Sequence, residues 1–200
     1  MAIILQKKGA QHQILLQKTE RGAVNIELQW SNNAPEDLDL GCYYELRNGR
    51  RSLIDALQFM GGNGGPRDYI TKQGCYSYPP YIWHTGDDRG NRQNSTETII
   101  VNAIGLYFIR RIVVYAYIYE GVAKWQLTDA VVNITIPEHE KVSVRLGETN
   151  DLRRFCAIAQ LDFDNDNTVT VKRLVTFHDT HSDCDRQYGW GFKYNKANKD

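Results

Sequence analysis

Apolar and polar residues alternate over several short stretches of the chain. In residues 23–30 the apolar side chains are Val24, Ile26, Leu28 and Trp30, and mostly polar residues stand between them. Successive side chains of a strand point to opposite faces, so this pattern predicts a strand with one covered face. Residues 37–46, DLDLGCYYEL, repeat the alternation with apolar residues at the even positions.

Six further stretches are rich in the β-branched and aromatic residues that favour strands. They are residues 99–101, 112–119, 131–136, 142–146, 155–161 and 169–177. Because RRIVVYAYIY at 110–119 is almost continuously apolar, we expect this strand at the centre of a sheet, buried on both faces. Alternating aromatic residues at 188–194 predict a last core-facing strand, preceded by a polar turn at 177–185. The similar halves of residues 3–18 predict a local hairpin.

Helical periodicity is confined to short pieces near residues 102–108 and 122–127, and turn-forming residues separate the predicted strands. Many short strands joined by turns predict an all-β fold, an antiparallel β-sandwich of two packed sheets with short helical turns. The length fits one domain over residues 1–195, followed by a polar tail at 196–200.

Composition and charge argue against some classes of function. Lys plus Arg and Asp plus Glu number 24 each, so there is no excess positive charge for nucleic-acid binding. The longest apolar run, 112–119, is far shorter than the roughly 20 residues of a membrane-spanning helix. At the N-terminus the charges follow the apolar residues, in the wrong order for a signal peptide. We therefore expect a soluble, cytoplasmic protein without direct membrane insertion.

Four cysteines lie far apart and form no C-x-x-C pair. We expect them to be reduced and mostly buried, in preference to a zinc or disulfide framework.

Two acidic segments offer candidate metal ligands. Asp37 and Asp39 are two apart on a predicted strand, so their carboxylates project from one face about 7 Å apart and repel each other. The second segment is the loop GDDRGNRQNSTE at 86–97. Its candidate oxygen donors are Asp87, Asp88, the Gly90 carbonyl, Asn91, Asn94 and Glu97.

Oxygen donors without histidine or cysteine suit calcium, which accepts about 6 to 8 ligands in flexible geometry, better than zinc. The residues alone also allow an ordinary solvated loop, in which Arg89 and Arg92 neutralise the acids.

A third acidic stretch resembles an EF-hand loop. Asp162, Asp164 and Asp166 have its 1, 3, 5 spacing, but Asn167 replaces the glycine at position six and Arg173 replaces the closing glutamate. A hairpin tip is the preferred interpretation.

Histidines supply two weaker candidates. His178, His181, Asp183 and Cys184 are all residue types that zinc accepts, but their spacing matches no strong signature, so a polar turn is preferred. His84 stands beside the acidic loop as a partner of its ligands or as a structural residue.

The chain also resembles a known family. DLDLGCYYEL, YIWHTGDDRG, ETIIVN, RRIVVYAYIYEGV and DRQYGWGF occur in the order and spacing of the tellurium-resistance TerD family, most closely its TerA branch. The similarity extends from about Leu15 to Phe192. It implies a β-sandwich, calcium bound by acidic loops, and a role in bacterial stress defence against tellurite, some phages and pore-forming colicins.

By motif, Asp37 and Asp39 match the D-L-D pair of the family, Asp87 and Asp88 match the start of its G-D-[ND] loop, and Glu97 matches the glutamate that closes the loop. The family usually has a threonine before the glycine that is Gly90 here, and further acids follow where this chain has Asn94. Fewer negative ligands predict weaker calcium binding, or one ion in place of two.

These observations favour a non-enzymatic, calcium-binding module whose partners are other stress-response proteins, membrane-associated ones among them. A calcium-dependent carbohydrate or small-ligand module is the alternative, with Tyr78, Tyr81 and Trp83 as its candidate aromatic surface. A metal-assisted hydrolase is a third, less favoured interpretation, because the chain has no G-x-S-x-G nucleophile elbow and the loop is poor in histidine.

Overall fold

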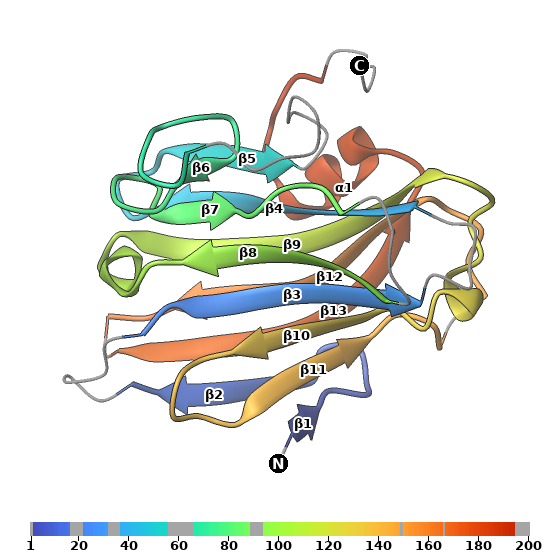
Figure 1. The fold of residues 1–200 in the computed structure, drawn as a ribbon, viewed down its shortest axis with the longest axis horizontal. Coiled ribbons are helices and arrows are strands. Elements are labelled where there is room, and N and C mark those ends of the chain that lie inside the picture. Colours follow the sequence, from blue (N-terminus) through green and yellow to red (C-terminus); the bar gives the residue numbers. More distant parts are fainter. Residues whose placement is uncertain are drawn as a thin grey trace.

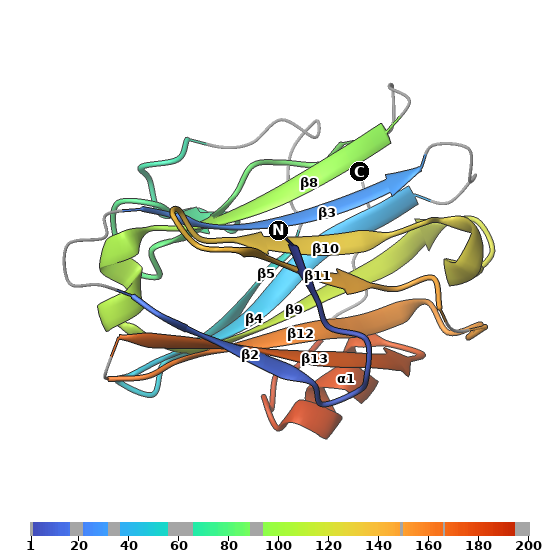
Figure 2. The same ribbon diagram turned by 90° about the horizontal axis from the view of Figure 1, so that it is seen from below.

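Two β-sheets packed face to face form the protein (Figures 1 and 2). The computed structural model describes residues 2–16, 22–31, 37–55, 66–88, 94–148, 150–165 and 167–194. The all-β sandwich predicted from the alternating pattern is confirmed. No helix in these ranges has the length and hydropathy needed to cross a membrane.

One sheet has seven strands in the order β1–β11–β10–β3–β8–β7–β6. Its strands are β1 (Ala2–Ile4), β11 (Lys141–Arg145), β10 (Val131–Thr135), β3 (Val24–Ser31), β8 (Asn94–Val101), β7 (Ile82–His84) and β6 (Gly74–Cys75). The other sheet has six strands in the order β2–β13–β12–β9–β4–β5. Its strands are β2 (Gln11–Leu15), β13 (Thr168–His178), β12 (Phe155–Phe163), β9 (Ile109–Glu120), β4 (Asp37–Leu46) and β5 (Arg51–Asp55).

The main core lies between the sheets. On β3 the side chains alternate between buried and half-buried, and the buried set is the apolar one predicted from the sequence. Leu38, Leu40 and Cys42 of β4 face the same core. Strand β9 lies between β12 and β4 and is covered on both faces, which confirms the prediction of a central strand.

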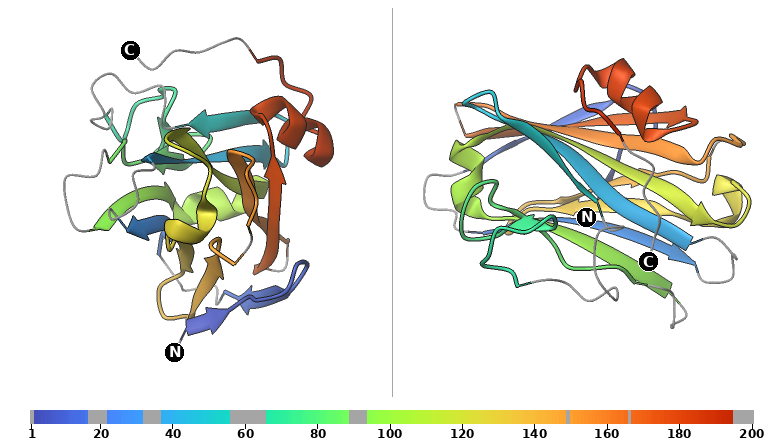
Figure 3. Two further views of the ribbon diagram at one scale, coloured as in Figure 1. Left: turned by 90° about the vertical axis from the view of Figure 1, so that its right-hand side faces the viewer. Right: turned by 90° about the horizontal axis from the view of Figure 1, so that it is seen from above.

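A second apolar cluster covers the outer face of the six-stranded sheet. Helix α1 (His181–Tyr188) and the segment after it lie against this face (Figure 3). The aromatic residues at 188–194 do pack against the sheet, but the predictions of a strand there and of a polar turn at 177–185 are wrong. Thr180 caps the helix by accepting a hydrogen bond from the Asp183 N–H, and Gly189 ends it at φ 70°.

The predicted hairpin at residues 3–18 is also wrong. Strand β1 pairs in parallel with β11 of the seven-stranded sheet, whereas β2 pairs with β13 of the other sheet. The two similar halves therefore form edge strands of two different sheets.

The short helical turns occur near their predicted places, as η3 (Ala103–Tyr107) and η4 (Trp125–Leu127). The segment that resembles an EF-hand joins β12 to β13, as expected for a hairpin tip, and Asn167 adopts φ 66° there. Asp166 lies outside the described residues.

Candidate metal site

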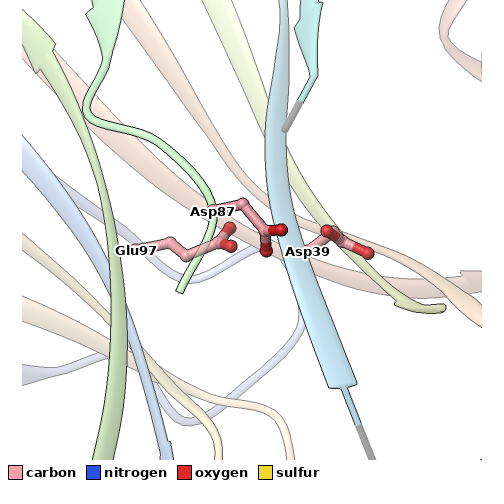
Figure 4. Close-up of side chains that lie close together, drawn as sticks. All are labelled: Asp39, Asp87 and Glu97. Carbon is pink, nitrogen blue, oxygen red and sulfur yellow. The ribbon is translucent and has the colours of Figure 1, made fainter. Parts of the chain in front are cut away.

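Three carboxylates from three separate segments meet near the end of β7 (Figure 4). They belong to Asp39 on β4, Asp87 in the segment after β7, and Glu97 on β8. One oxygen of each lies within 4.8 Å of one oxygen of both others. Asp39 and Glu97 are completely buried, and Asp87 is half-buried. We call these three residues the carboxylate cluster.

The period of β8 explains the inward position of Glu97. Ser95, Glu97, Ile99 and Val101 are all fully buried and share the inner face of the strand. Because side chains two apart in a strand lie on one face, Glu97 continues the apolar row of Ile99 and Val101 into the space between the sheets. A carboxylate at a core position costs free energy unless polar groups form hydrogen bonds with it.

The Leu40 peptide of β4 supplies polar groups of this kind. Among the described residues β5 pairs with β4 from Gly41 to Glu45, and Leu40 directly precedes that paired stretch. The Leu40 N–H donates to Glu97 Oε2 at 2.7 Å, and the Leu40 carbonyl lies 3.1 Å from His84 Nε2. Side chains from β7 and β8 of the opposite sheet thus form hydrogen bonds with the Leu40 peptide of β4.

The hydrogen bonds of His84 define its protonation. Its Nδ1 accepts from the Gly86 N–H at 3.0 Å, so the ring proton is on Nε2 and is donated to the Leu40 carbonyl. Burial lowers the pKa of His84 to about 4, so the ring is neutral near pH 7 and is not ion-paired with Glu97 Oε2, 3.7 Å away. Both ring nitrogens are therefore occupied, and His84 positions the site without being a metal ligand.

Opposing effects act on the pKa of Glu97. Burial raises its pKa well above the ordinary value, and the negative charges of Asp87 and Asp37 raise it further. Hydrogen bonds from the Leu40 and Asp88 N–H groups act in the opposite direction. A divalent cation among the three carboxylates would remove the repulsion and favour the charged form.

The two other predicted carboxylates lie outside the cluster. Asp88 Oδ2 accepts from the Thr96 N–H at 3.0 Å, and the Asp88 N–H donates to Glu97 Oε1 at 3.2 Å, so Asp88 fastens the segment after β7 to β8. Asp37 is half-buried at the start of β4, opposite Glu120 of β9.

The neutral donors predicted from the loop are described only in part. Asn94 begins β8 opposite Ser31 of β3, but its side chain is outside the description. Gly90 and Asn91, together with the two loop arginines, lie outside the described residues.

Tyr117 is a neighbour of the site that the sequence did not reveal. It is opposite Asp39 in the pairing of β4 with β9, and burial raises the pKa of its hydroxyl, with Asp55, Asp39 and Glu97 adding to the effect. Its proximity depends on strand register, as does that of the Leu40 peptide, and neither has a local signature in the sequence.

The histidine-containing stretch around α1 does not form a comparable group. Within the described ranges, the carboxylate cluster is the one set of three metal-ligating side chains brought together. His178 Nε2 lies 2.9 Å from Thr176 Oγ1, and His181 Nε2 lies 3.1 Å from Asp55 Oδ2. Cys184 is buried in the second apolar cluster.

All four cysteines are buried and unpaired in disulfides, as predicted. Burial raises the pKa of the Cys42 and Cys156 thiols and raises that of Cys184 to about 12. These thiols are in the protonated, poorly nucleophilic form at neutral pH.

The fold and the site together define a two-sheet β-sandwich with a buried group of carboxylates between a strand of one sheet and a loop of the other. The sequence is 32% identical to the tellurium resistance protein TerA of an Alcaligenes species, in an alignment that covers 92% of this chain and 55% of that protein. The chain thus spans about half the length of this relative. No family model matches the chain.

Two solved structures share the fold. A protein of unknown function superposes with a TM-score of 0.57 and 12% identity over 81% of this chain and 92% of the other. A homologue of the telluride resistance protein TerD from Streptomyces coelicolor gives a TM-score of 0.54 and 14% identity over 80% and 92% of the two chains. At these identities the structures support the fold alone. The sequence similarity to TerA over 92% of this chain supports assignment to the TerD/Ter family of tellurium-resistance proteins.

Proposed function

We propose that the carboxylate cluster binds one calcium ion, and that the chain acts without catalysis as a calcium-organised interaction module of a bacterial stress-response system in the cytoplasm. The observation that carries this proposal is the convergence of Asp39, Asp87 and Glu97 within 4.8 Å, from segments about 10 to 58 residues apart. In this proposal the ion joins β4 to β8 and to the segment between β7 and β8.

The donor chemistry supports calcium. All three side chains of the cluster offer carboxylate oxygens, and the nearest histidine, His84, has both nitrogens in hydrogen bonds. Calcium accepts about 6 to 8 oxygens in flexible geometry, so backbone carbonyls and waters can complete such a set. Magnesium requires a near-octahedral site and zinc favours nitrogen and sulfur ligands, so both suit the cluster less well.

Family membership supports the biological part of the proposal. The relative that covers most of the chain is named a tellurium resistance protein, which describes a phenotype and not a reaction. The buried thiols disfavour direct chemistry on tellurite, because a reactive cysteine needs exposure and a low pKa. We therefore propose that the surface ordered by the ion binds partner proteins, and that it binds neither nucleic acid nor a membrane interior.

Calorimetry tests the metal part of the proposal. The protein is stripped with EDTA, dialysed, and titrated with calcium, magnesium or zinc chloride. We expect the wild type to bind one calcium ion per chain. In the Asp39→Asn, Asp87→Asn double variant, the heat of calcium binding should be lost. Asp68→Asn, a change at an exposed residue, is the matched control. Absence of calcium binding at about 1 mM, the weak end of extracellular calcium sites, would contradict the proposal.

The biological part is tested in a bacterium whose tellurite resistance depends on this gene. We expect the double variant to lose resistance while it accumulates to normal levels, and the control to keep it. Full resistance in the double variant would separate the phenotype from the cluster.

A further inference from the structure

A pocket unrelated to the carboxylate cluster lies beside β5, the last strand of the six-stranded sheet among the described residues. It has a volume of about 850 Å³ and is bordered by β5, by residues 70–80, by the start of α1 and by the end of the described chain. Pockets of roughly 300 to 1,000 Å³ are typical of small-molecule sites.

Positive charge dominates the opening of this pocket. Arg50, Lys72 and Lys193 line it, and all three are exposed. None of the three forms an ion pair with another described residue. Since the chain as a whole has no net charge, three cations around one pocket are a local excess. Anions are attracted to such a surface.

The acidic residue in the pocket does not cancel this charge at the opening. Asp55 is 4% exposed, and its Oδ2 accepts from the Tyr115 hydroxyl at 3.2 Å and lies 3.1 Å from His181 Nε2. The His181 ring is fixed in turn by contacts with the rings of Tyr117 and Phe155, at centroid distances of 5.1 and 4.6 Å. The Asp55 carboxylate is therefore buried and bonded to Tyr115 and His181.

Hydroxyl groups and an apolar wall complete the lining. Ser182 supplies a hydroxyl that can donate to anionic oxygens, whereas the Thr71 hydroxyl donates to the Gly74 carbonyl. Ser182 also belongs to the first turn of α1, where the helix dipole favours negative charge. Tyr44, Ile70, Pro79 and Pro80 also line the pocket and contribute rings and aliphatic groups.

We propose that this pocket binds a small phosphomonoester, with the phosphate near the three cations and a flat, apolar group against Tyr44 and the two prolines. A phosphate dianion can use several cations and hydroxyl donors at once, whereas a carboxylate offers one charge and two oxygens. The apolar wall has no role in binding an inorganic ion, which is why the ligand needs an organic part. This site is independent of calcium.

Phenyl phosphate is a suitable probe, because it has a phosphate monoester and one flat ring. Its binding is measured by calorimetry and by changes in the amide NMR spectrum, in EDTA so that no metal contributes. We expect saturable binding of one molecule per chain. Lys72→Glu and Lys193→Glu each reverse one charge of the pocket and should weaken binding at least tenfold, or about 1.4 kcal/mol.

The matched control is Lys7→Glu, the same change at an exposed residue between β1 and β2. It should bind phenyl phosphate as the wild type does. Lys72→Gln, which removes the charge without reversing it, should show a smaller loss, and it replaces Lys72→Glu if that variant melts at a lower temperature. Inorganic phosphate should bind at least tenfold more weakly than phenyl phosphate.

Three results would overturn the inference. The first is no saturation below roughly 10 mM phenyl phosphate, which is weaker than an ordinary metabolite site. The second is equal weakening by Lys7→Glu and Lys72→Glu, which would indicate a general charge effect. The third is equal affinity for inorganic phosphate, which would remove the role of the apolar wall.

Discussion

Replacement of Asp87 by asparagine should separate the proposed calcium binding from folding. The two side chains have nearly the same shape, but asparagine removes one negative charge from a cluster whose oxygens lie within 4.8 Å of one another. At an effective dielectric of about 20, two charges at that distance repel by up to about 3 kcal/mol. The raised pKa of Glu97 reduces this repulsion, because a protonated carboxyl carries no charge. In EDTA the variant should therefore be as stable as the wild type, or more stable.

Calcium should reverse this order. A ligand present at about 100 times its dissociation constant adds about 2.7 kcal/mol to the free energy of unfolding, which raises the melting temperature of a domain of this size by roughly 5 to 10 °C. We expect that increase in the wild type and its loss in Asp87→Asn. The measurement is thermal unfolding by circular dichroism, in EDTA and in calcium.

Asp88→Asn is the matched control, because it makes the same change at the adjacent residue. The Asp88 carboxylate accepts a hydrogen bond from the Thr96 N–H of β8 and lies outside the cluster. Its variant should lose some stability in EDTA and still gain from calcium. Equal loss of the calcium effect in both variants would refute the assignment of the ion to Asp39, Asp87 and Glu97.

Four further predictions follow from buried groups. Burial lowers the pKa of His84 from 6.5 to about 4, so between these pH values the folded state binds fewer protons than the unfolded state. Lowering the pH from 6.5 to 4 should therefore reduce the free energy of unfolding by about 3 kcal/mol. Urea unfolding should show a smaller pH dependence in His84→Gln. In Gly41→Ala the new Cβ would lie 2.4 Å from the Tyr115 ring, so we expect a loss of about 1 to 3 kcal/mol, and an unchanged urea midpoint would contradict it. Asp185 accepts from two backbone N–H groups and the Tyr194 hydroxyl, so Asp185→Ala should expose the segment after α1 to limited proteolysis, with Asp183→Ala as the control. A thiol reagent should label none of the four cysteines of the native protein within the time in which it labels all of them in urea, and rapid native labelling would contradict their burial.

The sequence predicts the parts of the fold that depend on local pattern. Alternation identified β3 and the inward face of β4, because one strand carries its own period. The continuously apolar β9 was placed correctly for the same reason. Residues 3–18 were misassigned because similarity between two halves says nothing about which sheet each half joins, and that choice depends on distant partners in β11 and β13.

Helix α1 was not predicted, although the sequence holds signals for both of its ends. Thr180 and Asp183 have the spacing of a helix cap, and Gly189 stands where a helix commonly ends. Alternating aromatic residues further along favoured a strand instead. These aromatic residues do contact the sheet, but they belong to a short helix and the segment after it. Their burial was therefore predictable, and their backbone conformation was not.

The candidate site was predictable only as a set of residue types. Motif and spacing selected Asp39, Asp87 and Glu97, but they selected Asp37 and Asp88 with equal weight. Which carboxylates meet depends on how the two sheets pack, because Glu97 and His84 of the seven-stranded sheet bond the Leu40 peptide on β4 of the other sheet. Without the Leu40 N–H, Glu97 would be a buried acid with one hydrogen-bond donor fewer, which costs stability. The packing of β4 against β7 and β8 is therefore the structural condition for the carboxylate cluster, and no local motif encodes it.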